Sequence, residues 1–402
     1  MIRGVSKARR TALVLTGLVL LSFNLRPAAV SVGPVLEEVR DALDMSGPEA
    51  GLLTALPVLA FAIFGALAPA FARTVGLHRA AAVSLVAVVV GLGGRAAAHA
   101  DTTFLVLSAV ALAGMATANV LLPSLVKLHF PDRIGRATAV YTTALATGLT
   151  SAFLLTVPIS HAFGSWRAGL GIWALTALVA LVPWLALSTN DRHLARDVRT
   201  ITFRAVARTR IGWAMVLVFG LQSLQAYSIF GWFSQLWRDH GYDASEAGIL
   251  VGIIAAMSIP LSLWIPAACA RRDNQVGMIL AVTACYLVGY GMLLVDAHTL
   301  AIPAAILIGV GCSIFPLVLT LIGLRAHTSA GTAALSGFTQ STGYLIAGIG
   351  PFAVGLLHDG SGGWTVPLIV LLVLLVPQLF VGLAVARPAY IEDELRPTRS
   401  NV

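Results

Sequence analysis

The chain has 402 residues, of which 58% are hydrophobic and only 11% are charged. About a quarter of the residues in a soluble domain are charged, and a chain of this length has no core large enough to hide so much apolar surface. The composition therefore excludes a soluble globular protein and predicts one that spans a lipid bilayer. The formal net charge of +8 does not indicate a nucleic-acid partner, because membrane proteins concentrate basic residues in their loops.

Apolar runs of about 20 residues follow one another along the chain, and each predicts a membrane-spanning helix. The first run follows several basic residues and is long enough to remain a span rather than a cleaved signal peptide. The three cysteines fall inside apolar runs, without the spacing of a disulfide framework or metal site, so we expect no cofactor. The twelve predicted spans cover residues 11–33, 49–71, 78–99, 102–127, 137–160, 167–187, 211–236, 246–269, 277–296, 300–324, 332–357 and 364–386.

The basic residues predict which side of the membrane each loop faces. Of the 26 lysines and arginines, 21 lie on one set of alternate loops and termini, and four lie on the other. Loops rich in lysine and arginine stay in the cytoplasm, so we expect an inner-membrane protein with both termini cytoplasmic. A basic segment joins two sets of six spans on that side. The predicted domains are therefore 1–187, the cytoplasmic loop 188–210, and 211–402 with a short cytoplasmic tail.

The first span contains an arginine next to a proline, within the run FNLRPAAVSVGP. Arg26 lies ~22 Å along the helix from the cytoplasmic end, too deep to reach the head groups easily. Even on a lenient scale an arginine near the bilayer centre costs about 2.5 kcal/mol, so it needs a cavity, a partner or a ligand. All 18 acidic residues lie in loops or at span ends. We favour contact with an anionic solute; the alternative is that Arg26 snorkels outward or bonds to backbone carbonyls of a neighbouring helix.

Pro27 removes a backbone N–H and disfavours helical dihedral angles at the residue before it. We therefore expect the first span to be broken or kinked beside Arg26, which would expose backbone groups to a solute. On a regular helix Asn24 and Arg26 point about 200° apart. A distortion at Pro27 would allow both side chains to reach one cavity.

Few other polar side chains fall inside the spans. Gln222 and Gln225 share a helix face at a spacing of three residues, and Gln340 and Tyr344 share one at a spacing of four. Each has a structural alternative, because interhelical hydrogen bonds are common in membranes and contribute about 0.6 kcal/mol on average. With Arg26, the candidate solute-binding residues are Asn24, Asn119, Tyr141, Gln222, Gln225, Gln340 and Tyr344.

The two halves of the chain repeat one another weakly. Gln222 is the counterpart of Asn24, at an offset of 198 residues. Matches in the same order and the same membrane orientation indicate a parallel repeat of six helices, an arrangement found in transporters with a site between two lobes. The matches pair Arg40-Asp41 with Arg238-Asp239, Glu49-Ala50-Gly51 with Glu246-Ala247-Gly248, Leu122-Pro123 with Phe315-Pro316, and Thr147-Gly148 with Thr342-Gly343.

Several segments resemble a known family. NLRPAAVSVGP, ANVLLPSLVKLHFPDR, FGLQSLQAYSIFGW and FPLVLTLIGLRAHTSAGTAALSGFTQSTGYLIAG look like the cyanate/nitroimidazole transporter branch of the major facilitator superfamily. The resemblance covers essentially the whole chain. It implies an all-α membrane protein whose twelve transmembrane helices form two parallel-repeat six-helix bundles. One departure is Pro69, which stands where the loop after the second span usually has an aspartate.

The predicted function is secondary transport of a small anionic or strongly polar solute by alternating access, with Arg26 as the positive element. The resemblance implies cyanate-like or nitroimidazole-like solutes, and small carboxylates suit the guanidinium equally well. The alternative is a multidrug or metabolite exporter of the same fold. An enzyme is not expected, because the spans contain no nucleophile–base pair or metal ligands.

We expect a monomer whose partners are the solute and the lipid bilayer. In the absence of a carboxylate inside a span, coupling to protons would have to run through the solute, Glu49, Glu246 or water.

Overall fold

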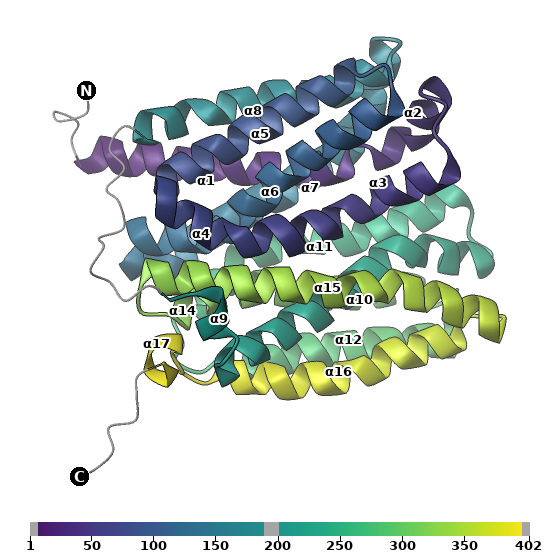
Figure 1. Ribbon diagram of the computed structural model, residues 1–402. Helices are drawn as coiled ribbons and strands as arrows, with labels where there is room; N and C mark the ends of the chain where they lie inside the picture. The colour runs from purple at the N-terminus through teal and green to yellow at the C-terminus, as the bar shows by residue number, and fades with distance from the viewer. Residues whose placement is uncertain (1–6, 189–200, 396–402) are drawn as a thin grey trace. The chain divides into compact units, whose positions relative to one another are not determined.

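The computed structural model describes residues 7–188 and 201–395, and every regular element in this part of the chain is a helix (Figure 1). Twelve stretches are long and apolar enough to cross a membrane, which confirms the predicted number of spans. Residues 189–200 of the predicted connecting loop lie outside the described residues. The observed spans are Thr11–Val35, Leu56–Val75, Leu77–Ala97, Asp101–His129, Pro131–Ala162, Trp166–Ser188, Arg210–Asp239, Glu246–Cys269, Val276–Asp296, Ala301–Leu324, Ser329–Ser361 and Thr365–Ala386.

The helices divide between two compact units. The first unit consists of residues up to Asp132 together with Val140–Thr202, and the second of Arg133–Ala139 together with the residues from Phe203 onward. The predicted domain boundaries at residues 187 and 211 stay a prediction.

In the first unit, α5 lies against both α6 and α8, and α1 also packs on α6 and α8 (Figure 1). Helices α3 and α4 belong to one continuous helical stretch, joined by the π-helical segment Phe61–Gly65. The short helix α2 follows the first span, and Val35, Val39 and Leu43 bury its apolar side against Phe104. The helices are α1 (Lys7–Val30), α2 (Leu36–Ala42), α3 (Gly47–Ala60), α4 (Ala66–Val75), α5 (Leu77–Ala97), α6 (Asp101–His129), α7 (Ile134–Ala162) and α8 (Trp166–Ser188).

In the second unit, α10 lies against α15 and α16, and α12 lies against α13 and α16 (Figure 1). Helices α13 and α14 together form one span. Gly362 has a φ of 67°, a left-handed conformation that glycine adopts without strain, and it ends α15. The helices are α9 (Phe203–Val206), α10 (Arg210–Asp239), α11 (Ala244–Cys269), α12 (Val276–Asp296), α13 (Ala301–Cys312), α14 (Ile314–Leu324), α15 (Ser329–Ser361), α16 (Thr365–Ala386) and α17 (Ile391–Glu394).

Large apolar side chains stay exposed on the spans of both units. Val295, Phe352 and Phe380 are 81%, 69% and 67% exposed. Apolar surface of this kind is unfavourable in water over a wide area, whereas lipid chains cover it without penalty. The exposed faces are therefore those that a bilayer covers.

Helix α1 runs through Pro27 to Val30, so the helix is not broken beside Arg26, and a kink there stays a prediction. Pro27 lacks the N–H that would bond to the carbonyl oxygen of Phe23, one turn earlier. Gly148 of α7 packs against that oxygen so closely that a Cβ atom at position 148 would lie 2.0 Å from it. The proline lies in the last turn of the helix, and the carbonyl it leaves without a partner is covered by a neighbouring helix.

The repeat-related Gly343 has a similar place in the second unit. A Cβ atom there would lie 2.7 Å from Cδ1 of Phe219 and 3.3 Å from the backbone nitrogen of Gly220, both on α10. Small residues let membrane helices approach closely. The matched glycines thus pack α7 on α1 and α15 on α10.

Glu49 and Glu246, which also match in the repeat, cap helices. The Glu49 carboxylate accepts a hydrogen bond of 2.7 Å from the N–H of Ser46, at the start of α3. Glu246 accepts one of 3.0 Å from the N–H of Asp243, whose own carboxylate accepts from the Glu246 N–H at 2.8 Å. These are capping boxes, which satisfy N–H groups at the start of a helix. Both carboxylates therefore have a structural role.

Two arginines near the ends of predicted spans, Arg95 and Arg325, are buried, and each binds the C-terminal end of a helix. In the first unit Arg95 donates to the carbonyl of Ala28 at 3.2 Å and to Oγ of Ser31 at 2.8 Å, near the end of α1. In the second unit Arg325 donates to the carbonyls of Val385 and Ala386, at 2.9 and 3.1 Å. Burial lowers the pKa of Arg325. A cation at a helix C-terminus interacts favourably with the partial negative charge there.

Helix α17 caps two long helices of the second unit. Glu392 accepts hydrogen bonds from the N–H groups of His327 and Thr328, at 2.9 and 3.0 Å, where α15 begins. Glu394 accepts from the N–H groups of Arg210 and Ile211, at 2.7 and 3.3 Å, where α10 begins. Carboxylates are favourable at helix N-termini because the free N–H groups there carry partial positive charge.

Candidate functional site

Arg26, the central residue of the predicted site, lies on α1 inside the span Thr11–Val35 and is half-buried. It also interacts with other residues of the chain. A fork of parallel donors suits two acceptor atoms of a small planar or linear anion.

Asn24 is fully buried, and its amide holds α1 to α8. Its Nδ2 donates to the carbonyls of Leu20, at 2.8 Å, and Thr176, at 3.2 Å. Its Oδ1 accepts a hydrogen bond of 2.6 Å from the Thr176 hydroxyl. The contacts are those of the interhelical alternative.

The other two candidates of the first unit are Asn119 on α6 and Tyr141 on α7. Asn119 is 3% exposed and Tyr141 is 1% exposed, and both interact with other residues of the chain. Their part in solute binding stays a prediction.

Gln222 and Gln225 of α10 differ in how their amides are bonded. Gln225 is fully satisfied: its Nε2 donates to the Leu371 carbonyl at 2.8 Å, and its Oε1 accepts from the Tyr290 hydroxyl at 2.7 Å. Gln222 is 1% exposed and donates to Oγ of Ser223 at 2.6 Å. Its Oε1 has no hydrogen-bond partner among the described residues. Gln225 therefore ties α10 to α12 and α16, whereas Gln222 retains a buried acceptor for another donor.

Gln340 and Tyr344 share a face of α15, as predicted from their spacing. Gln340 is buried and donates to Oγ of Ser336 at 2.8 Å. The Tyr344 ring lies against α10, with its centroid 5.1 Å from that of Phe219 and 6.2 Å from that of Tyr227. The structure thus brings Tyr344 to the helix that carries Gln222.

The sequence did not predict that Arg95 binds the end of α1, the helix that carries Arg26. Arg95 is 1% exposed and bonds to the end of the helix that carries Arg26. Its position near the end of an apolar run resembled that of a loop arginine. The signal was the surrounding glycines, because a Cβ atom at Gly91 would lie 2.4 Å from the backbone nitrogen of Ala111. Such close packing of α5 on α6 marks a tightly buried segment.

Twelve spans with no appended folded domain among the described residues, and with polar side chains buried inside the spans, are the features of a membrane transporter. Residues 13–351 match the Major Facilitator Superfamily, and the chain belongs to this superfamily of transporters. It is therefore a transporter and not an enzyme.

Three relatives align with nearly the whole chain. It is 35% identical over 381 residues to the uncharacterized transporter YycB of Bacillus subtilis, covering 94% of each chain. It is 32% identical to the 2-nitroimidazole transporter of Escherichia coli, covering 93% of this chain and 95% of the relative. It is 28% identical to the cyanate transport protein CynX of Escherichia coli, covering 86% and 90%. These matches confirm the predicted family resemblance.

Among solved structures, the proton:xylose symporter XylE in complex with 6-bromo-6-deoxy-D-glucose is similar, with a TM-score of 0.78. The alignment covers 97% of this chain and 99% of that chain, at 13% identity. A likeness at this identity shows the fold alone, and it confirms the predicted fold class.

Proposed function

We propose that the protein moves a small anionic or strongly polar solute by alternating access, with Arg26 as the positive element of its binding site. The solute is cyanate-like, nitroimidazole-like or a small carboxylate. The protein works as a monomer in the inner membrane with both termini in the cytoplasm, the orientation that the distribution of basic residues favours.

The observation that carries this proposal is a half-buried arginine in the interior of a span. A full positive charge at this depth costs free energy unless a water-filled cavity, a partner or a ligand compensates it. Such residues commonly mark the path of a solute. An anion gains charge-assisted hydrogen bonds from arginine that a cation or an alkyl group cannot make.

The names of two relatives agree with this chemistry. One is a 2-nitroimidazole transporter and the other a cyanate transport protein. Cyanate is a linear anion, and the nitro group of a nitroimidazole offers two oxygen acceptors side by side. Both shapes match the two parallel donors of a guanidinium.

A thermal-shift screen of the purified protein tests the class of solute. Cyanate, 2-nitroimidazole and small carboxylates should raise the melting temperature, because a ligand that binds only the folded state adds about 2.7 kcal/mol of stability at a hundredfold excess over Kd. Imidazole, which lacks the nitro group, is the control for 2-nitroimidazole. Urea, which is uncharged, is the control for cyanate. Stabilisation by hydrophobic cations alone, with efflux of such dyes from vesicles, would replace this proposal by the exporter.

Gln222 and Gln225 provide a matched pair of substitutions on one helix. Gln225→Ala should lower stability by about 1–2 kcal/mol, because it leaves the buried Tyr290 hydroxyl and the Leu371 carbonyl without their partner. Gln222→Ala removes one hydrogen bond to Ser223 and should change stability less. If Gln222 contacts the solute, its loss should weaken affinity by about tenfold, or 1.4 kcal/mol. Melting temperature and solute affinity, measured on both variants, give the comparison.

The result that contradicts this assignment is the reverse pattern. It would be a Gln222→Ala variant that melts earlier than Gln225→Ala and binds solute as well as the unchanged protein.

A further inference from the structure

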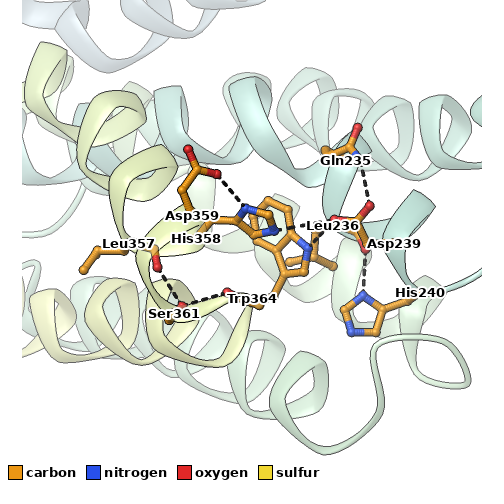
Figure 2. Close-up of polar contacts among 10 residues, drawn as sticks. Gln235, Leu236, Asp239, His240, Leu357, His358, Asp359, Ser361 and Trp364 are labelled. Carbon is orange, nitrogen blue, oxygen red and sulfur yellow. Dashed lines mark hydrogen bonds and ion pairs between the residues drawn. The ribbon is translucent and has the colours of Figure 1, made fainter.

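A cluster of titratable and aromatic side chains lies at the end of the second unit where α10 ends and α16 begins (Figure 2). It consists of Asp239 on α10, His358 and Asp359 on α15, Trp364 at the start of α16, and Trp232 on α10, and we call it the His358 cluster. Glu49 and Glu246 are engaged as helix caps, whereas this cluster contains a histidine that can bind a proton.

Both nitrogens of the His358 ring face a carboxylate. Nε2 lies 3.6 Å from Oδ2 of Asp239, and Nδ1 lies 3.3 Å from Oδ1 of Asp359 (Figure 2). A neutral imidazole has a hydrogen on only one ring nitrogen, so it can donate toward only one carboxylate and presents a lone pair to the other. The imidazolium has hydrogens on both nitrogens. The arrangement therefore suits the protonated ring.

One aromatic neighbour favours the same form. The ring centroid of Trp364 lies 4.4 Å from that of His358, whereas the ring of Trp232 is roughly parallel to His358 at the longer distance of 6.4 Å. A cation beside an indole face is attracted by the electron density of the ring. His358 is also in the last turn of α15, where the helix end carries partial negative charge.

Asp239 is the centre of the cluster, and three elements converge on it. Its Oδ2 accepts a hydrogen bond of 2.8 Å from Nε1 of Trp364, and its Oδ1 accepts one of 2.6 Å from Gln235. A carboxylate at the end of a helix is unfavourable on its own, so these donors explain its position. Next to it, Arg238 is exposed, and Nδ1 of His240 lies 2.7 Å from the Leu236 carbonyl oxygen.

The cluster joins the last part of α15 to α10. Gly350-Pro351 precedes this part, and Pro351 leaves α15 without one backbone hydrogen bond. Beyond that point Trp232 donates to the Pro351 carbonyl at 2.8 Å, and a Cβ atom at Gly355 would lie 2.8 Å from the Trp232 ring. Helices bend most readily where a proline interrupts the hydrogen-bond ladder. Trp232 and the His358–Asp239 pair therefore tie residues 352–361 to α10.

We propose that His358 is a proton-binding site, and that its protonation clamps the end of α15 to α10 and so makes transport depend on the pH outside the cell. With the charge present, His358 bonds to Asp239 and the second unit moves as one body. Without it, the last part of α15 is held less firmly beyond Pro351. The inference uses the orientation proposed above, in which this end faces outward, and it holds for any solute.

Tryptophan fluorescence of the purified protein tests proton binding without a solute. Imidazolium quenches an adjacent indole more than imidazole does, so emission should fall as the pH is lowered through about 8 to 5, the range in which histidine gains its charge. The His358→Gln variant should lose this change. His298→Gln is the matched control, because His298 is an exposed histidine whose ring stacks on Tyr242, just beyond the same end of α10. Quenching that survives in His358→Gln would overturn the proposal.

Uptake into vesicles of fixed internal pH tests the clamp. The unchanged protein should transport at least about fivefold faster at an external pH of about 5.5 than at about 8. His358→Gln and Asp239→Asn should be slow at both values. His358→Arg, charged at every pH, should be fast at both, which a purely structural role for the histidine would not produce. Persistence of the normal pH profile in His358→Gln or His358→Arg would contradict the clamp, as would a profile that follows only the internal pH.

Discussion

Replacing Arg26 by alanine is expected to abolish solute binding while leaving the protein folded. The guanidinium is the positive group in the interior of the first span, and loss of a buried charge-assisted contact typically costs 2–5 kcal/mol of affinity. Affinity should therefore fall by about thirtyfold to several thousandfold. Arg26→Lys should retain part of the binding, because an ammonium group keeps the charge but cannot form two parallel hydrogen bonds. Equilibrium binding of the solute found in the screen, together with uptake into proteoliposomes, gives the measurement.

Arg40→Ala is the control for charge alone. Arg40 is an exposed arginine of α2 in the same unit, and its removal changes the net charge by the same amount. It should leave affinity unchanged. An Arg26→Ala protein that binds and transports like the Arg40→Ala protein would remove Arg26 from the site and reopen the identity of the solute.

Gly148→Ala is expected to destabilise the first unit strongly. The added Cβ would lie 2.0 Å from the Phe23 carbonyl oxygen and 3.1 Å from its Cα, and both are backbone atoms that cannot rotate away. Overpacking of this kind costs about 1–3 kcal/mol or more, because α1 and α7 have to separate. Transport should fall as well, since α1 carries Arg26. The melting temperature and the yield of monodisperse protein report the effect.

Two other glycines calibrate this result. Gly343→Ala should cost less, because its closest neighbour is the ring edge of Phe219, a side chain that can shift. Gly252→Ala on α11 has no heavy atom within 4 Å of the added Cβ, so it should be neutral or stabilising by up to about 1 kcal/mol. If the Gly148→Ala and Gly252→Ala variants have the same melting temperature, the close contact between α1 and α7 is not what holds the first span.

The number and order of the spans could be predicted because hydropathy depends only on local sequence. An apolar run of about 20 residues has one stable solution in lipid, a helix that satisfies its own backbone groups. The repeat was also visible, and Glu49 and Glu246 gave part of its signal. Their structural reason, two capping boxes, was present in the sequence as Ser46-x-x-Glu49 and Asp243-x-x-Glu246.

The partners of individual side chains could not be predicted in the same way. The hydroxyl that binds Asn24 belongs to Thr176, 152 residues away. Nothing local distinguishes an asparagine that faces a solute from one that faces a neighbouring helix. The continuity of α1 through Pro27 could not be predicted for the same reason, since the glycine that covers the Phe23 carbonyl is on another helix.

Charged residues near span ends show the other limit. From the sequence alone, Arg95 and Arg40 are both counted among the four basic residues on the side away from the cytoplasm, yet Arg95 is buried against the end of α1 and Arg40 is exposed. The His358 cluster was missed because its members come from three helices and each, taken alone, is an ordinary residue at a helix end.

The contacts of α17 impose an order on biosynthesis. Glu394 accepts a hydrogen bond from the N–H group of Arg210 and lies 184 residues after it in the chain. Helix α10 therefore enters the membrane long before this cap has been translated. Until then Thr209 and Thr328 cap α10 and α15 locally, while the N–H groups that Glu392 and Glu394 will bind rely on water or lipid head groups. A version of the protein cut just after Arg387 would contain every span yet lack these caps. A fusion tag should therefore be attached after Leu395 and should not replace residues 388–395.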